Sequence, residues 1–336
     1  VLPRESINAL ITLEKGSIRY LPDHPLVNNI EAVIHIDAVS LDADLSSGHT
    51  MKNTKLSGGK VRIADLNADN PRIDVGFEAA APATDAVAIL RLPRLNHASR
   101  LGLNDNIEGN VIAKAELAFD FYAPKDEAGN SLEPDVDYHV VAMLAGVGQQ
   151  QFMKKFDIVG ANGTLEVQNN GLSFNGTANV NGADVSTADI KYLFQPEEGF
   201  DTFIKVKAVA PVESFKRFGY PEFPFLKGNV AVEADVSQGE THEISNATFD
   251  LTNTAVEDNI ISWIKPENEA ARLVIKAEKK DGMLSIPSFH LTGKDTDIAG
   301  ALGLSPDLSG INMVKTEKAT LGKSTISSLL YDASGS

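Results

Sequence analysis

The sequence contains no cysteine and a single tryptophan, and aromatic residues make up only 7% of its 336 residues. The absence of cysteine excludes disulfides, thiolate catalysis and cysteine-ligated zinc. No apolar run approaches the roughly 18–20 residues that a membrane-spanning helix needs. Basic residues are also in deficit, since 30 Lys and Arg stand against 46 Asp and Glu and give a net charge of −16. Such a chain repels phosphate groups, so we expect no nucleic-acid partner and no electrostatic docking on anionic lipid.

Signals for catalysis or metal binding are equally scarce. The seven histidines are dispersed, and no two of them stand at metal-ligand spacing on one element. The segment that starts at Asp42 and Asp44 begins like a calcium loop, but Gly48 comes one position late and the twelfth position is not acidic. There is no Gly-x-Ser-x-Gly, and Gly58-Gly59 lacks the strand-to-helix setting of a phosphate loop. We therefore expect a protein that is not an enzyme and holds no metal or other cofactor.

What the sequence does contain is strict alternation of apolar and polar residues, the pattern of half-buried β-strands. The clearest strand is 109–121, and a second spans 230–236. Further short strands are predicted at 61–66, 72–78, 164–168, 172–180, 202–209, 248–252, 272–278, 284–291 and 297–304. The apolar residues of the two clearest strands form the candidate site: Val111, Ala113, Ala115, Leu117, Phe119, Phe121, Val230, Val232, Ala234 and Val236.

Two local features complicate this pattern. In the run 32–45 the apolar phase slips, which a β-bulge near Ala38 would explain. Helical pattern is limited to three short segments, Pro93–Leu103, Pro211–Gly219 and a piece around Ile260–Ile264. The first two start with proline and end near glycine, as helices often do.

An internal repeat links these helices to the strands that follow them. The sequence Arg-Leu-Gly-Leu at 100–103 precedes Gly-Asn-Val at 109–111, and Arg-Phe-Gly-Tyr at 217–220 precedes Gly-Asn-Val at 228–230. We expect approximate repeat units at 1–103, 104–219 and 220–336, joined in one continuous domain. Because Val1-Leu2-Pro3-Arg4 does not resemble a natural start, we also expect an internal fragment of a longer protein.

The apolar strand faces admit two architectures. Each face can pack on a second sheet in a closed sandwich, or it can line an open groove. The small residues at 113, 115 and 234 favour a groove, because a closed core would fill that space with larger side chains. The residue pattern alone still favours the sandwich, and a parallel β-helix is the rival architecture.

The order of four motifs adds a family resemblance. They are Gly-Ser-Ile-Arg-Tyr-Leu-Pro-Asp-His-Pro at 16–25, the run 55–66 with its Gly-Gly-Lys, Pro-Arg-Ile-Asp-Val at 71–75, and the turn at 107–111. In this order they resemble the AsmA-like proteins of Gram-negative bacteria, in particular the YhdP type. The resemblance implies an all-β fold: an elongated, highly twisted antiparallel sheet built from repeats, curved into an apolar groove, with a few short helices.

The resemblance also implies a function. Such proteins are periplasmic and anchored to the inner membrane by a segment that this chain lacks. We expect a segment of a bridge that shields phospholipid acyl chains between the inner and outer membranes. Its partners would be lipid acyl chains and envelope proteins at the ends of the full-length protein. The alternative is a non-enzymatic periplasmic β-scaffold for envelope biogenesis, which binds a protein partner through its edge strands.

Overall fold

The protein is mostly β-structure, with 73% of its residues in strands and 6% in helices. The computed structural model describes residues 7–19, 25–92, 98, 102–122, 124–127, 132, 135–220, 222–258, 263–281, 283–304 and 311–332. The chain divides into two compact units, unit 1 (residues 1–172) and unit 2 (residues 173–336).

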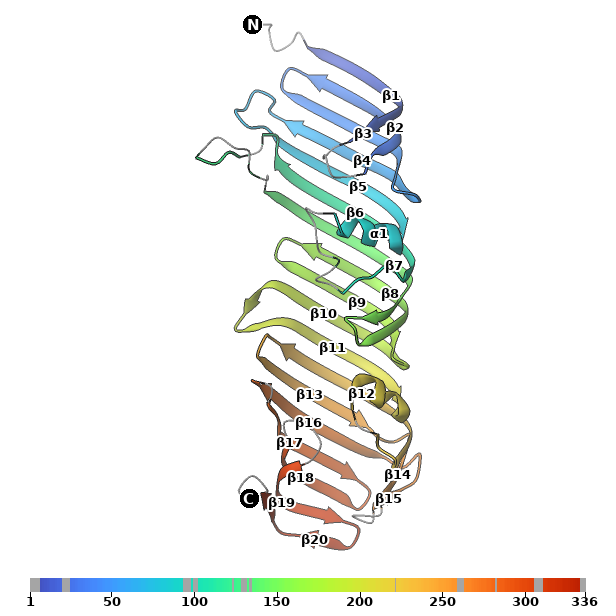
Figure 1. The fold of residues 1–336 in the computed structure, drawn as a ribbon, viewed down its shortest axis with the longest axis vertical. Coiled ribbons are helices and arrows are strands. Elements are labelled where there is room, and N and C mark those ends of the chain that lie inside the picture. Colours follow the sequence, from blue (N-terminus) through green and yellow to red (C-terminus); the bar gives the residue numbers. More distant parts are fainter. Residues whose placement is uncertain are drawn as a thin grey trace. The chain divides into compact units, whose positions relative to one another are not determined.

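Unit 1 is a series of strands that lie side by side in chain order, coloured blue to green in Figure 1. Each strand pairs antiparallel with the next, from β1 through to β8. Its elements are β1 (Asn8–Ile18), β2 (Val27–Asp37), β3 (Ser40–Thr50), β4 (Thr54–Ala64), β5 (Arg72–Pro82), α1 (Ala83–Leu90), β6 (Ile107–Asp120), β7 (Val136–Phe152) and β8 (Phe156–Gln168).

Unit 2 repeats this plan with one branch. The antiparallel series runs β10–β11–β12–β13–β16–β17–β18–β19, while β14 and β15 extend from the first residues of β12 and both β20 and β21 pair with β19. Its elements are β10 (Ala183–Glu197), β11 (Phe200–Pro211), the 3-10 helix η2 (Val212–Phe218), β12 (Leu226–Gln238), β13 (His242–Asp250), β14 (Thr254–Asp258), β15 (Trp263–Lys265), β16 (Ala271–Lys280), β17 (Met283–Gly293), β18 (Thr296–Leu304), β19 (Ile311–Leu321), β20 (Ser324–Ile326) and β21 (Leu329–Asp332). The remaining strand, β9 (Gly171–Val180), starts at the end of unit 1.

The all-β, antiparallel fold class predicted from alternation is confirmed, and the sheet is not closed into a barrel. The rival β-helix is excluded, because a β-helix requires parallel neighbours and the pairings within both units are antiparallel. The structure divides the chain into two compact units at residue 172. The predicted repeat boundaries at 103 and 219 stay a prediction.

The predicted bulge near Ala38 is wrong, because this segment is a tight hairpin between β2 and β3. The Asp37 carboxylate accepts hydrogen bonds from the backbone N–H groups of Val39 (2.7 Å) and Ser40 (2.6 Å). These bonds hold the pKa of Asp37 below its ordinary value. The chain therefore reverses without glycine, and the phase slip in the sequence marks the change of strand.

The helix predictions had mixed outcomes. The predicted helix at Pro211–Gly219 is confirmed as η2, with Pro211 just before it and Gly219 in the left-handed conformation after it (φ 90°). Trp263–Lys265 is a strand and not helical, while 259–262 and most of Pro93–Leu103 lie outside the described residues. The sequence reading missed α1, which Asp85 fixes to the β3–β4 turn by accepting bonds from Asn53 N–H and the Thr54 hydroxyl.

Candidate functional site

The residues of unit 1 that oppose one another across neighbouring strands form continuous apolar rows. Directly opposed residues in a sheet point to the same face, so the register alone assigns each residue to a face. One row crosses β1 to β7 through Ile11, Ile34, Ala43, Val61, Val75, Leu117 and Tyr138. A second continues to β8 through Leu13, Ala32, Leu45, Gly59, Phe77, Ala115, Val140 and Val167. We call the face that carries these rows the apolar face of unit 1.

Unit 2 has an apolar face of the same kind. One row runs from β11 to β19 through Ala208, Val232, Phe249, Leu273, Leu291, Ile298 and Ala319. The row beside it contains Ala188, Val206, Ala234, Ala247, Ile275 and Phe289. Each unit therefore presents an apolar surface that crosses its strands without interruption by a charged residue in these rows.

The opposite face of each unit carries the charged side chains, with exposed apolar residues such as Ile112 and Val274 among them. In unit 1, Lys114 lies 2.9 Å from Glu116, and Lys60 lies 3.9 Å from both Asp42 and Asp44. Asp42 and Asp44, where the segment similar to a calcium loop begins, thus lie on β3 next to the Lys60 ammonium. In unit 2, Lys207 and Glu233 are 3.0 Å apart across β11 and β12. Because most of these side chains are well exposed, the ion pairs keep the face hydrated and add little stability.

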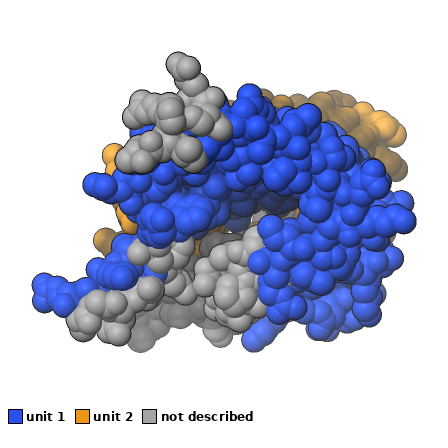
Figure 2. Space-filling model, turned by 90° about the horizontal axis from the view of Figure 1, so that it is seen from above, with its two compact units in different colours: residues 1–172 blue, residues 173–336 orange. Residues whose placement is uncertain are grey.

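No second sheet covers the apolar faces among the described residues. The elements in extensive contact are hydrogen-bonded strand neighbours, with α1 on β5 and β6 and η2 on β11 and β12. The accessible surface is 20810 Å². Two separate compact domains of half the mass would together expose about 16,000 Å². Figure 2 shows the described atoms of unit 1 in a curved arrangement.

The helices close only one part of each apolar face. In unit 1, Ala83 and Val87 of α1 form a small core with Ile107, and Val111 packs against it. In unit 2, Val212 of η2 packs with Val230, Leu251 and Ala271, and the neighbouring aromatic side chains Phe215, Phe223 and Trp263 extend this cluster. Among the described residues, the rows farther along the strands carry no helix.

The predicted site residues fall into distinct positions. Val111, Ala113, Ala115, Leu117 and Phe119 share the apolar face of unit 1, where Ala115 is 5% exposed and the others are half-buried. Val232, Ala234 and Val236 are half-buried on the apolar face of unit 2.

The two remaining candidates differ from these. Phe121 lies beyond the end of β6 and is 48% exposed. Val230 is 1% exposed because it lies in the cluster under η2, so it acts as core. Alternation thus assigned the faces, but it could not show which residues a helix covers.

The Gly-Asn-Val motifs lie at equivalent places in the two units, at the start of β6 in unit 1 and at the start of β12 in unit 2. We call these two places corners. Gly109 and Gly228 have φ values of 99° and 102°, in the left-handed region that favours glycine. A Cβ at Gly109 would lie 2.6 Å from the Gly146 carbonyl oxygen, and one at Gly228 would lie 2.5 Å from that of Asn253. Only glycine therefore fits at the start of β6 and of β12.

Sequence reasoning missed one residue that fixes the second corner. Lys265 is 2% exposed, and its Nζ donates to the carbonyl oxygens of Thr254 (2.7 Å), Pro266 (3.0 Å) and Thr252 (3.4 Å). Burial lowers the pKa of this ammonium. The sequence gives no signal for it, because a lysine at the end of a three-residue strand is usually exposed.

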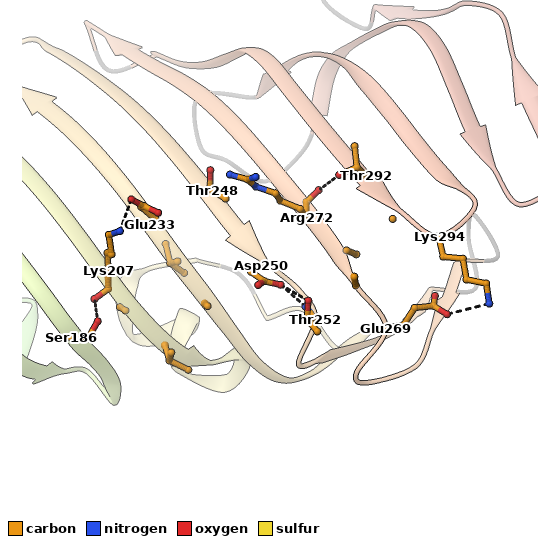
Figure 3. Close-up of a pocket in the computed structure, with 17 residues that line it drawn as sticks. Ser186, Lys207, Glu233, Thr248, Asp250, Thr252, Glu269, Arg272, Thr292 and Lys294 are labelled. Carbon is orange, nitrogen blue, oxygen red and sulfur yellow. Dashed lines mark hydrogen bonds and ion pairs between the residues drawn. The ribbon is translucent and has the colours of Figure 1, made fainter.

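An open depression of about 740 Å³ lies on the polar side of unit 2 (Figure 3). Most of its charged side chains are engaged with one another: Lys207 with Glu233, and Glu269 with Lys294 at 3.7 Å. The Asp250 carboxylate accepts a bond from the Thr252 hydroxyl at 2.6 Å. A surface whose charges are internally paired offers few anchors for a ligand, so the apolar faces remain the candidate site.

The described part of the chain contains no group of three or more His, Asp or Glu side chains placed to bind a metal ion. Within the same ranges, no helix has both the length and the apolar character needed to cross a membrane. Comparisons with protein-family models, with curated proteins and with solved structures find no match to this chain. The uncovered apolar faces and the resemblance found in the sequence are therefore the features that bear on function.

Proposed function

We propose that the apolar faces bind lipid acyl chains and that the protein is a segment of a lipid-conducting bridge. The observation that carries the proposal is the set of apolar rows that cross neighbouring strands of a unit, over which the described part of the chain places no second sheet. An acyl chain on such a face keeps its methylenes out of water while the headgroup stays at the solvated side.

The energetics favour this use of the surface. Each buried methylene contributes about 0.8 kcal/mol, so transfer of a sixteen-carbon chain through water costs on the order of 10 kcal/mol. Rows of Val, Ala, Leu, Ile and Phe shelter the chain at any point along the face. Apart from the hydroxyl of Tyr138 at the end of one row, they offer no polar anchor, so no position within the rows holds a lipid in a deep energy minimum.

The resemblance to AsmA-like proteins supports a more specific form of the proposal. In that form the lipid is phospholipid, the compartment is the periplasm, and transport connects the inner and outer membranes. The protein would need no catalytic residue, because the step is physical transfer.

The direct test is mass spectrometry of lipids that copurify with the protein in the absence of detergent. We expect phospholipid bound to the wild-type protein. Ala113→Asp and Ala234→Asp place a carboxylate on the half-buried apolar faces and should reduce the bound lipid several-fold. Matched controls are Ile112→Asp and Val274→Asp, because both residues are exposed (53% and 41%) and their opposed neighbours place them on the other face.

The variants separate an open face from a closed core. On an open face the new carboxylate reaches water, so Ala113→Asp and Ala234→Asp should fold and lose lipid only. Folded wild-type protein that carries no lipid, or variants that bind as much lipid as their controls, would reject the proposal.

A further inference from the structure

The segments that connect the strands of unit 1 carry opposite charge at the two ends of the strands. The antiparallel order places the connections after β1, β3, β5 and β7 at one end and those after β2, β4 and β6 at the other. Outside the strands and α1, the described charged residues of the first end are Arg19, Lys52, Arg91, Asp105, Lys154 and Lys155. Those of the second end are Asp65, Asp69, Lys125, Asp126, Glu127 and Asp135. We call the first end the basic margin of unit 1 and the second end its acidic margin.

The net charge of −16 for the whole chain therefore conceals a local surplus of positive charge. At the basic margin, Asp105 is ion-paired with Arg91. Within the described part of the chain, no carboxylate lies within ion-pair distance of the ammonium groups of Lys52 and Lys154. These two groups are thus available to an anionic partner, although the charge of the whole chain disfavours one.

Two hairpin turns of the basic margin carry an exposed methionine directly before their lysines. Between β3 and β4, Met51 is 37% exposed and precedes Lys52. Between β7 and β8, Met153 is 54% exposed and precedes Lys154 and Lys155. An apolar side chain beside lysines suits the surface of a bilayer, where the apolar group enters the acyl layer and the ammonium groups stay at the phosphates.

The turn between β7 and β8 extends beyond the neighbouring strand. β6 begins at Ile107, which lies opposite Gln149 of β7, so residues 150–156 reach past the last pair between these strands. The Asp157 carboxylate accepts the backbone N–H of Gln151 at 3.0 Å, so this acid is engaged at the base of the turn. The turn therefore presents its methionine and lysines beyond the end of β6.

The spacing of the two turns favours an extended partner. They are four strand spacings apart, which is about 19 Å. A flat anionic surface contacts both turns at once, whereas an inorganic phosphate ion or a single acidic side chain contacts only one. Nucleic acid is extended and anionic as well, but it offers the exposed methionines no apolar environment. The surface of a bilayer provides both.

We propose that the basic margin of unit 1 docks on a membrane that contains anionic phospholipid. Met153 inserts below the headgroups, Lys154 and Lys155 bind the phosphates, and Lys52 makes the second contact. Each lysine near such a surface strengthens binding by about fivefold. The partner is the headgroup layer of an intact bilayer, so the proposal does not depend on acyl-chain binding by the apolar faces.

Sedimentation of the whole protein with vesicles tests the charge requirement. The vesicles contain phosphatidylcholine alone, or phosphatidylcholine with about one third phosphatidylglycerol. We expect binding to the second kind only, weakened by added salt. Reversal of both lysines, in Lys154→Glu with Lys155→Glu, should weaken binding by at least about 25-fold, and Lys52→Glu by about fivefold.

A pair of lysines in unit 2 gives a control with the same change in net charge. Lys279→Glu with Lys280→Glu alters a hairpin turn where Glu243 lies opposite Lys279 and Asp281 follows Lys280. Because acids already balance these lysines, this variant should bind vesicles like the wild type. Circular dichroism melts establish that every variant is folded.

A fluorescent label tests insertion of the turn directly. The sequence contains no cysteine, so Met153→Cys can carry a single environment-sensitive dye. Its emission should shift to the blue on vesicles with phosphatidylglycerol. The same dye at Met283→Cys should not shift, although Met283 is 65% exposed at the start of β17. Met153→Ser should weaken vesicle binding several-fold.

Four results would overturn the proposal. One is equal weakening by the two double-lysine variants, because binding would then follow the net charge. Another is an unshifted dye at position 153 on vesicles that bind the protein. A third is binding to DNA or polyglutamate as tight as to vesicles and undiminished by Met153→Ser, which would make the margin a site for soluble polyanions. The last is a folded protein that binds neither kind of vesicle.

Discussion

Two corners have nearly the same backbone, one at the start of β6 in unit 1 and one at the start of β12 in unit 2. They differ in the side chains whose hydrogen bonds hold the opposite turn. In each, a proline ends the preceding strand opposite an asparagine: Pro82 faces Asn110, and Pro211 faces Asn229. The glycine before that asparagine approaches a carbonyl oxygen closely in both. The preceding turns match as well, since Leu103 N–H donates to Ala98 O (2.9 Å) and Tyr220 N–H donates to Phe215 O (3.1 Å).

In each corner, a different kind of side chain holds the turn whose carbonyl oxygen lies close to the glycine. In unit 1, the Asn162 side chain accepts a bond from Gly146 N–H at 3.0 Å and donates to the Gly160 carbonyl oxygen at 2.6 Å. In unit 2, the buried ammonium of Lys265 binds the carbonyl oxygens around Thr254. Glycine and proline are thus common to both corners, while the groups that hold the opposite turn differ.

The largest effect should come from the glycines. Gly109→Ala and Gly228→Ala should each destabilise the protein by about 3 kcal/mol or more, because the new Cβ meets a carbonyl oxygen and the backbone has positive φ. Urea denaturation followed by circular dichroism measures the change. Gly58→Ala is the control, since nothing lies within 4 Å of its Cβ position. If only one of the two corner variants were destabilised, the corners would not be equivalent.

Removal of the buried ammonium should have the next largest effect. Lys265→Met keeps the length of the side chain but leaves the carbonyl oxygens of Thr254 and Pro266 without their donor. We expect a loss of about 2–3 kcal/mol, because hydrogen bonds to charged groups are strong and the Thr254 acceptor stays buried. Fluorescence of Trp263, the only tryptophan of the sequence, reports on this corner. A variant as stable as the wild type would show that the hydrogen bonds of Lys265 do not stabilise the turn.

The hydrogen bonds of the Asn162 side chain in unit 1 should contribute less to stability. Asn162→Ala removes two uncharged hydrogen bonds at an exposed site, so we expect a loss of about 1 kcal/mol. Chemical denaturation of Asn162→Ala and Lys265→Met in parallel gives the difference. An equal loss of stability in the two variants would contradict the expected difference between the two corners.

The smallest effect concerns two aspartates with the same local role in the two units. Asp37 accepts bonds from Val39 and Ser40 N–H, and Asp250 accepts bonds from the hydroxyl and the N–H of Thr252. These bonds lower the pKa of both carboxyls from the ordinary value of 3.8. Their contribution to stability is therefore present above that value and is lost as the pH falls through the lower folded pKa.

Asp37→Asn and Asp250→Asn should accordingly reduce the loss of stability on acidification below about pH 4. Thermal melts between pH 2 and 7 are the measurement. The stability difference from wild type should be largest at neutral pH and should disappear in acid. A difference independent of pH would show that the hydrogen bonds do not depend on the charge of the carboxylate.

The sequence predicted the strands well because alternation is a local signal, and the register then follows from which face is apolar. It also located both corners, since Gly-Asn-Val after a short turn is specific to a backbone that only glycine adopts. It failed at Asp37-Ala38-Val39-Ser40, where a carboxylate makes the turn that glycine usually makes. It also failed at α1, whose first residues continue an apolar run, and the N-cap, Pro82, makes no side-chain capping bond.

The candidate site could be predicted only in part, for a physical reason. Alternation assigns Val230 and Val232 to one face, but the exposure of each depends on what lies over it. Val230 is covered because η2 and Leu251 meet there, and these contacts join residues distant in sequence. Lys265 illustrates the same limit, since its burial is created by carbonyl groups from the preceding turn.

The apolar rows also imply a capacity. Neighbouring strands are about 4.8 Å apart, so the eight strands from β1 to β8 give the face of unit 1 a length of about 34 Å across the strands. One acyl chain occupies about 15 Å, half the thickness of a bilayer core. A chain lying along a row would then span about three strands, and unit 1 has room for about two chains end to end. Occupancy measured as lipids per protein should therefore be a small whole number, set by the count of strands and not by the number of binding residues.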